Sequence, residues 1–486
     1  MSSLVLQGTS HLEAALSAAR RAVAEGSRRL FEPVDPASLW VFRVVFGLLM
    51  LGATARFWAH GWIERHYLAP KFFFKYHGFE WVTAWAGQGM YVHFALMGAA
   101  ALFVALGLFY RVSALAFFVL FTHAHLIDKT HYLNHYYFVS LVSLLLVFLP
   151  LHRVGSLDRR LGLVRGPAEV PRWALWLLRF QVGAVYFFAG VAKLNGDWLF
   201  HAQPLTIWLG ANTDFPVLGP LFRFKATAYA MSWAGAAFDL SVPFLLSFRR
   251  TRPFAYAAVI VFHGITGKLF PIGMFPWIMT LAALILFPAG WPRRLVPERL
   301  ATKLWPAPAP EPLARPAVSR GALPTSPALS AGKKLILGAL VAYAAVQVLV
   351  PLRHWLYPGN GQWTEQGFRF SWKVMLVEKN GDVEITALDP ASGKRWSIDP
   401  REDLQAYQIK QMSTQPDMIL EYCRFVAARL REKGYPDIVV RAQAHVAYNG
   451  RPPAPLLDAA VDLGRERDGL LPYGFLLPAP DSKPEL

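Results

Sequence analysis

The sequence is poor in cysteine and in acidic charge. Its 486 residues contain one cysteine, Cys423, which excludes an internal disulfide, a CxxC redox pair and a cysteine-based metal site. We expect that thiol to be buried and structural. There is no glycine-rich phosphate loop, no HExxH zinc motif and no GxSxG nucleophile elbow, so the common soluble chemistries lack support and no metal site is predicted.

The N-terminus also lacks a secretory signal. Residues 1–34 are polar to amphipathic and carry Arg20, Arg21, Arg28 and Arg29 without an apolar stretch. Insertion into a membrane would therefore begin at the first apolar run, at 38–57, which only Arg43 interrupts.

Apolar residues, by contrast, are abundant, at 54% of the chain. A helix needs about 20 apolar residues to cross a bilayer. Runs near that length lie at 38–57, 92–110, 112–127, 136–151, 173–194, 228–247, 254–271, 273–290 and 334–352. The sequence therefore predicts an α-helical polytopic membrane protein with about nine transmembrane helices.

Basic residues lie between the apolar runs. A net charge of +17 would suit a nucleic-acid partner only if Lys and Arg were concentrated on one soluble face, so we predict no nucleic acid. Short inner loops of membrane proteins are enriched in Lys and Arg. The inner side then holds the N-terminus, the loop with Arg111, and the loops 153–172, 249–252 and 293–303.

Because successive spans cross the membrane in opposite directions, the remaining loops lie outside together with the C-terminal region. These loops are 58–91, 128–135, 195–227 and the turn near 272. We predict an integral protein of the cytoplasmic membrane of a bacterium, with its active site toward the outer face. The predicted parts are a cytoplasmic N-terminus (1–34), a transmembrane catalytic domain (35–304), a Pro/Ala-rich linker (305–332), a ninth transmembrane helix (333–354) and an extracytoplasmic domain (355–486).

The C-terminal part changes to a charged, alternating composition, which predicts a mixed α/β, β-rich domain. We expect strands at Val383–Leu388, Arg395–Ile398 and Ile438–Tyr448, with a turn at Ser392-Gly393. A helix is expected at 416–433, because Asp417 lies near its start and Gly434 just beyond its end.

Polar residues beside apolar spans are the candidate site, because they are costly to keep in a membrane. They cluster in three stretches, 128–135, 186–198 and 262–275. His135 opens the fourth span and Lys193 closes the fifth, at the same predicted depth. Lys193 is either a snorkelling anchor or a desolvated amine that acts as a base near neutral pH. For His263, a structural role and a cofactor contact both remain open.

At these stretches the sequence resembles the vitamin K-dependent gamma-glutamyl carboxylases, with the HTTM-type membrane domain of their prokaryotic homologues. The resemblance covers most of the chain. It runs through DPASLWVFRVVFG (35–47), LIDKT and NH (126–135), YFFAGVAKLNGDW (186–198), FDLS (238–241), FH and LFPIGMF (262–275), and W-T with F-S-W (363–372).

The resemblance implies a lyase-class enzyme that oxidises a vitamin K hydroquinone (phylloquinol or menaquinol) to its epoxide with O2 and adds CO2 to a glutamate. Lys193 matches the lysine that deprotonates the hydroquinone, and His135 the histidine needed for carboxylation. His263, Asn134, Asp128, Met274 and Phe275 match positions expected to contact the cofactor. Trp363, Phe368, Phe370, Ser371 and Trp372 match the glutamate-binding segment. The implied partners are membrane lipid, a glutamate-containing peptide or protein, and a quinone reductase.

Two departures bear on the reaction. Ala192 replaces a second lysine of the animal enzymes, while Gly367 and Phe368 replace a leucine and a tyrosine of the glutamate-binding segment. The hydroxyl of that tyrosine is therefore missing at Phe368. Three functions stay open: the carboxylase, a quinol epoxidase or oxidase that lacks carboxylation, and a non-catalytic module that binds quinone or lipid.

Overall fold

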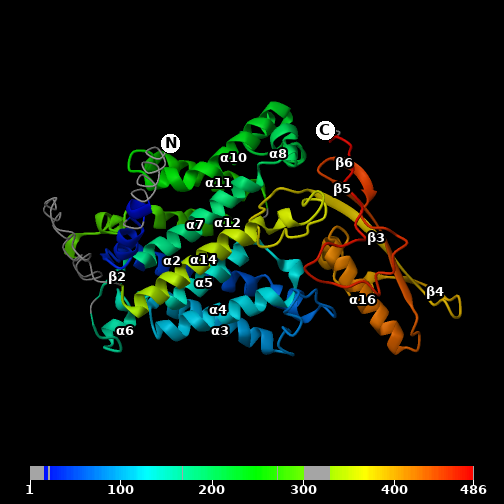
Figure 1. Ribbon diagram of the computed structural model, residues 1–486, viewed down its shortest axis with the longest axis horizontal. Helices are drawn as coiled ribbons and strands as arrows, with labels where there is room; N and C mark the ends of the chain where they lie inside the picture. The colour runs from blue at the N-terminus through cyan, green and yellow to red at the C-terminus, as the bar shows by residue number, and fades with distance from the viewer. Residues whose placement is uncertain (1–15, 20–21, 167, 271, 300–328, 485–486) are drawn as a thin grey trace, which may run out of the picture.

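The computed structural model describes residues 16–19, 22–166, 168–270, 272–299 and 329–484, so most of the predicted linker lies outside the described residues. A bundle of long helices is joined at one end to a C-terminal domain that contains a β-sheet (Figure 1). The bundle comprises α2 (Ala37–Ala59), α3 (Gly89–Leu106), α4 (Tyr110–Ile127), α5 (Asn134–Phe148), α7 (Arg172–Ala192), α10 (Lys225–Ser247), α11 (Arg252–Leu269), α12 (Phe275–Ala282) and α14 (Ala331–Leu352).

Each of the nine expected apolar runs overlaps one of these helices, but α12 covers only Phe275–Ala282 of the run 273–290 and is followed by a 3-10 helix at Ala283–Leu286. Among the described residues, five helices are long and apolar enough to cross a membrane: α2, α3, α4, α7 and α14, the last with its extension to Leu356. The helix α5 and the segment Phe275–Leu286 are apolar but shorter. The chain is thus an integral membrane protein, and the full count of nine spans stays a prediction.

Two glycines set the helix packing that positions the site. A Cβ atom added to Gly47 of α2 would lie 2.6 Å from the backbone nitrogen of Ala105 on α3. One added to Gly190 of α7 would lie 2.7 Å from the side chain of Leu240 on α10. Because real Cβ contacts are never so short, only glycine permits these approaches. The close approach at Gly190 holds the end of α7 against the middle of α10.

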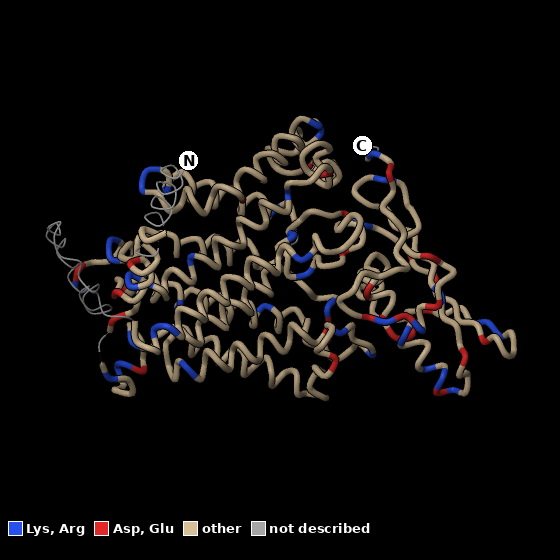
Figure 2. Tube along the Cα trace, viewed as in Figure 1, with Lys and Arg blue, Asp and Glu red and all other residues tan. Residues whose placement is uncertain are grey.

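The end of the bundle away from the C-terminal domain carries a group of Lys and Arg positions (Figure 2). There the short strands β1 (Pro33–Val34) and β2 (Val170–Pro171) pair, and Arg293 contacts Asp35 at 2.7 Å. Arg43, which interrupts the first apolar run, is fully buried and donates hydrogen bonds to the carbonyls of Leu151, Val154 and Gly155. The two terminal nitrogens of this guanidinium are therefore hydrogen-bonded inside the protein, whereas its Nε has no partner among the described residues.

The C-terminal domain has a four-stranded antiparallel sheet in the order β4-β3-β5-β6. Its strands are β3 (Lys379–Leu388), β4 (Arg395–Ile398), β5 (Val439–Tyr448) and β6 (Arg451–Pro455). The three predicted strands are confirmed, and β6 was not anticipated. The helices α15 (Ala406–Met412) and α16 (Pro416–Glu432) accompany the sheet, and the predicted helix 416–433 is confirmed by α16. Cys423 lies on α16 and is buried and free, as expected.

The C-terminal domain docks on loops at one end of the bundle. Lys129, between α4 and α5, forms ion pairs with Asp417 and Glu421, each with an N–O distance of 2.9 Å. Burial opposes the charged form of Lys129, but the two carboxylates outweigh it and raise its pKa. Arg451 reaches Asp197 at 2.6 Å. The loops 58–91, 128–135 and 195–227 thus all contact the C-terminal domain, and their orientation relative to the membrane stays a prediction.

Candidate active site

The side chain of Lys193 turns into the protein at the end of α7. Its amine donates to a carboxylate oxygen of Asp239 at 2.7 Å and to the carbonyl of Ala189 at 3.3 Å. Both charged side chains are 6% exposed. The pair forms because Gly190 lets α7 approach α10, which carries Asp239. Since a snorkelling lysine keeps its head group in water, this burial does not fit a simple anchor.

A small cavity of about 80 Å³ adjoins this pair. Tyr186 lies two turns before Lys193 on the same face of α7, and its hydroxyl is 2.9 Å from Nε2 of His263 on α11. The other ring nitrogen of His263, Nδ1, is buried without a hydrogen-bond partner among the described residues. The cavity therefore joins an ion pair, a phenol and an imidazole within largely apolar walls.

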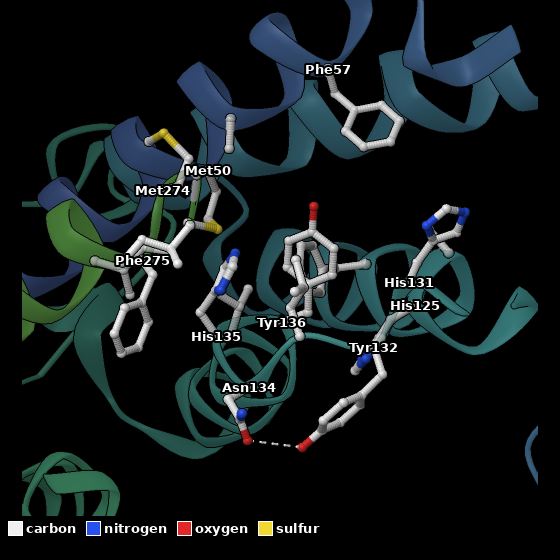
Figure 3. Close-up of a pocket in the computed structure, with 18 of the residues that line it drawn as sticks. Met50, Phe57, His125, His131, Tyr132, Asn134, His135, Tyr136, Met274 and Phe275 are labelled. Atoms are coloured by element: carbon white, nitrogen blue, oxygen red, sulfur yellow. Dashed lines mark hydrogen bonds between the residues drawn. The ribbon is translucent and has the colours of Figure 1, made fainter. Parts of the chain in front are cut away.

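A larger cavity of about 600 Å³ lies beside it and is lined by His135 (Figure 3). His135 is the second residue of α5 and is 6% exposed, and its ring packs against that of Phe275 with centroids 5.9 Å apart. Asn134 is fixed on both sides: its amide donates to the carbonyl of Lys373 at 3.1 Å, and its oxygen accepts from Tyr132 at 3.1 Å. The start of α5 is thus tied to the C-terminal part of the chain.

The lining of the larger cavity contains a single charged side chain, Arg56, near the end of α2. Its guanidinium stacks over the ring of Trp62, 4.8 Å from the centroid, and makes no ion pair with any described carboxylate. His125 and His131 also line this cavity. Burial lowers the pKa of His131, which lies outside the helices of the bundle, to about 4, so this ring is neutral at pH 7.

The two cavities share a wall. Ile272, Phe275, Val374 and Met375 line both. Lys193 and His135, which the sequence placed at one depth, therefore lie in adjoining chambers on either side of this apolar wall. Met274 lines only the larger chamber.

Comparison with known families follows this division of the molecule. Residues 31–291, more than half of the chain, match the HTTM domain, and residues 332–482 match the lumenal domain of vitamin K-dependent gamma-carboxylase. The chain belongs to the vitamin K-dependent gamma-carboxylase family. No solved structure matches it.

The predicted glutamate-binding residues of this carboxylase homologue, in the segment 363–372, do not all face the same cavity. Of its five predicted residues, only Phe368 lines the larger cavity. Trp363 is fully buried in the C-terminal domain and donates to the carbonyl of Leu477. Phe370 and Trp372 pack on Tyr137 with ring centroids 4.8 Å away in each case. Ser371 lines a third cavity. Four of the five thus shape the segment without facing the chamber that contains His135.

Asp128 also lies away from the chambers. Its carboxylate accepts hydrogen bonds from the backbone of Thr130 and from the side chain of Gln408 on α15. It lines none of the three described cavities. Its position indicates a role in joining the loop 128–131 to the C-terminal domain, and gives no support to the predicted cofactor contact.

Several residues of the chambers were not singled out from the sequence. Asp239 lay within the matched motif FDLS, and a carboxylate inside an apolar run is a signal that can be read from sequence. Arg56 carried no such signal, because an arginine at the end of a span is ordinarily an anchor. Val374 and Met375 belong to an irregular segment, where no periodicity marks which side chains face a cavity.

Proposed function

We propose that this homologue is a vitamin K hydroquinone-dependent gamma-glutamyl carboxylase that couples epoxidation of the quinol by O2 to carboxylation of a peptide or protein glutamate with CO2. One observation carries the proposal. A buried lysine with a carboxylate partner and a histidine facing a large cavity lie in adjoining chambers, as two coupled half-reactions require.

The residues present fit a hydroquinone. A cavity of about 80 Å³ is small for a bicyclic ring, but its shared wall with the chamber of about 600 Å³ gives room for one that bridges the two. Phe275 and Met375 offer apolar contacts from the shared wall, while the unpartnered Nδ1 of His263 offers a hydrogen bond to a ring oxygen. When bound, the hydroquinone and O2 together supply the strong base that removes the glutamate γ-proton.

Lys193 starts the sequence of proton transfers as the acceptor of the hydroquinone proton. The neutral amine has the free lone pair for this step. Asp239 holds the amine in place by accepting a hydrogen bond from it. Tyr186 orients the ring of His263 through the 2.9 Å contact. The apolar walls exclude water from the chamber, which protects a reactive oxygenated species from hydrolysis.

The larger chamber suits the glutamate. Arg56 offers an uncommitted positive charge to a substrate carboxylate, and arginine binds carboxylates through two parallel hydrogen bonds. His135 and Asn134 line the same chamber at the start of α5 and serve the carboxylation half. Phe368 contributes an apolar ring where the family has a phenol.

The proposal includes a membrane orientation. The N-terminus and the loop 152–171 face the cytoplasm of a bacterium, and residues 355–486 lie outside with the site. A quinone reductase then supplies the quinol from the membrane. Protease cleavage in sealed vesicles checks this topology: cleavage of the C-terminal domain and of the loop 152–171 from the same side would contradict it.

A direct assay tests the activity. Purified protein is incubated with vitamin K hydroquinone, O2 and labelled bicarbonate, with and without a glutamate peptide, and epoxide and fixed label are followed separately. The carboxylase forms both. If folded protein binds the quinone but forms neither product, the chain is a non-catalytic module that binds quinone or lipid. The buried Lys193–Asp239 pair disfavours this function.

A second candidate is a quinol epoxidase that lacks carboxylation. The hydroxyl missing at Phe368 in the larger chamber favours it. Epoxide without fixed label for any glutamate peptide would identify this activity.

A further inference from the structure

A third cavity, of about 370 Å³, lies where the ends of α7 and α14 meet the C-terminal part of the chain. One wall is apolar and comes from the two helices and the residues that follow them, with Phe188, Val191, Leu194, Leu352 and Trp355. The polar part of the lining includes Asp197, Asn360, Gln362, Ser371 and Lys373. Ser371 and Lys373 face this cavity, whereas the next residues, Val374 and Met375, face the two chambers of the proposed active site.

Lys373 is buried and unpaired. The residue is 6% exposed, and its amine makes no hydrogen bond or ion pair with any described residue. The centroid of the Phe368 ring is 5.4 Å from the amine, and a Cβ added to Gly361 would lie 3.3 Å from it. An uncompensated buried charge is costly, so an anion in the cavity would be strongly favoured.

The nearby carboxylates are already committed to other partners. Glu365 accepts from Lys379 at 2.8 Å. Asp197, which lines the cavity, accepts from Arg451 at 2.6 Å and from Asn449 at 3.0 Å. Burial lowers the pKa of Lys373 to about 8, so the amine is still mostly charged at pH 7. The positive charge in this cavity therefore remains available to a ligand.

The apolar wall is accessible from outside the protein. Leu194 is 55% exposed and Trp355 is 67% exposed, although both are large hydrophobic side chains. They follow the ends of α7 and α14, two of the helices able to cross a membrane, and the apolar window of α14 is only 11% buried within the protein. Both residues therefore lie at the level where a spanning helix leaves the bilayer, beside the buried amine.

We propose that this cavity binds the anionic head group of a membrane amphiphile, a phosphate or a carboxylate, with Lys373 as the cation and the apolar wall against the first part of the acyl chain. A free inorganic anion would use the amine but would leave the apolar wall uncovered. A zwitterionic lipid would bring its own positive charge to the polar part of the lining. The combination of an unpaired amine and an accessible apolar wall selects an anionic lipid over both.

Native mass spectrometry of the full chain, released from vesicles containing equal phosphatidylglycerol and phosphatidylcholine, tests the site without any carboxylase substrate. The wild-type protein is expected to retain phosphatidylglycerol in preference, and Lys373→Gln to retain about tenfold less, as expected for loss of a charged hydrogen bond. Lys394→Gln is the matched control, because Lys394 is exposed on the outer hairpin of the sheet, and its retention should not change.

Acylation of Lys373 at pH 8, located by peptide mass mapping, gives a second measurement on unmutated protein. Phosphatidylglycerol vesicles should slow the labelling, whereas inorganic phosphate and phosphatidylcholine vesicles should not. Equal lipid retention by Lys373→Gln and wild type would overturn the proposal. Equal protection by inorganic phosphate would also overturn it, in favour of a free-anion site. Because neither readout involves quinol or CO2, the outcome is independent of whether the chain is a carboxylase.

Discussion

The amine of Lys193 lies 2.7 Å from the carboxylate of Asp239, and both side chains are almost completely buried where α7 packs on α10. This contact changes the picture of an isolated desolvated lysine. The amine has a carboxylate partner, and this contact fixes its position in the chamber. Asp239 is therefore a positioning residue with an electrostatic influence on the proposed first proton transfer.

The first prediction concerns Lys193→Arg. A guanidinium keeps its proton at all accessible pH values, so this variant should retain the ion pair with Asp239 and lose epoxide formation. A positioned general base contributes about 10² to 10⁴-fold in rate. Epoxide formation above about a tenth of the wild-type rate would show that the residue is not the base.

The second prediction separates Asp239 from Lys193. Asp239→Asn removes the charged acceptor that holds the amine of Lys193 at 2.7 Å, so epoxide formation should fall although Lys193 itself is unchanged. Asp239→Glu keeps a carboxylate and should recover most of that rate. A purely structural role would predict the same loss in both variants, and parallel assays of epoxide formation distinguish the two cases.

The sequence predicted Lys193 and His135 at one depth because apolar runs mark where helices end, and both residues lie at such ends. It did not predict the partner of Lys193, because Asp239 is brought to it by the close packing at Gly190. The segment around Phe368 was harder still. Phe370, Trp372 and Met375 have positive φ angles of 66°, 54° and 56°, so no helix or strand period indicates which side chains face the chamber.

The third prediction divides the two half-reactions. His135 lines the larger chamber and Lys193 the smaller, so His135→Ala should leave epoxide formation largely intact and greatly reduce CO2 fixation. Separate measurement of epoxide and fixed label checks this. If His135→Ala abolished epoxide as Lys193→Ala does, with folding and quinone binding intact, the histidine would belong to the first proton transfer. Should the wild type form epoxide alone, Phe368→Tyr is the matched repair.

The fourth prediction concerns the docking of the C-terminal domain. Lys129 is 4% exposed and holds Asp417 and Glu421 together, so Lys129→Met should leave two buried carboxylates without that cation. Breaking a buried ion pair costs about 3–5 kcal/mol, which should appear as a lower thermal unfolding temperature. Lys394→Met, at an exposed position, is the control and should not change it.

The same cluster predicts how stability depends on pH. Burial opposes ionisation of Asp417, but Arg369 and Lys129 outweigh it and hold the pKa of Asp417 well below its usual range. A carboxyl group whose folded pKa is depressed stabilises the fold above its unfolded pKa of about 3.9. That contribution should be lost as the pH falls below this value. In Lys129→Met the contribution should be smaller and its loss complete at a higher pH, because removal of one of the two cations raises the folded pKa of Asp417.

The last prediction tests the glutamate chamber through Arg56, the one charged residue in the described lining. Arg56→Gln removes the positive charge but keeps a polar side chain. We expect the KM for a glutamate peptide to rise about tenfold or more, as for loss of a charged hydrogen bond, while epoxide formation without peptide is unchanged. Arg56→Lys should recover part of the loss, because an ammonium keeps the charge without the two-pronged geometry of guanidinium. An unchanged KM in Arg56→Gln would mean that Arg56 only stacks on Trp62 at the membrane surface, and that the substrate carboxylate is bound elsewhere.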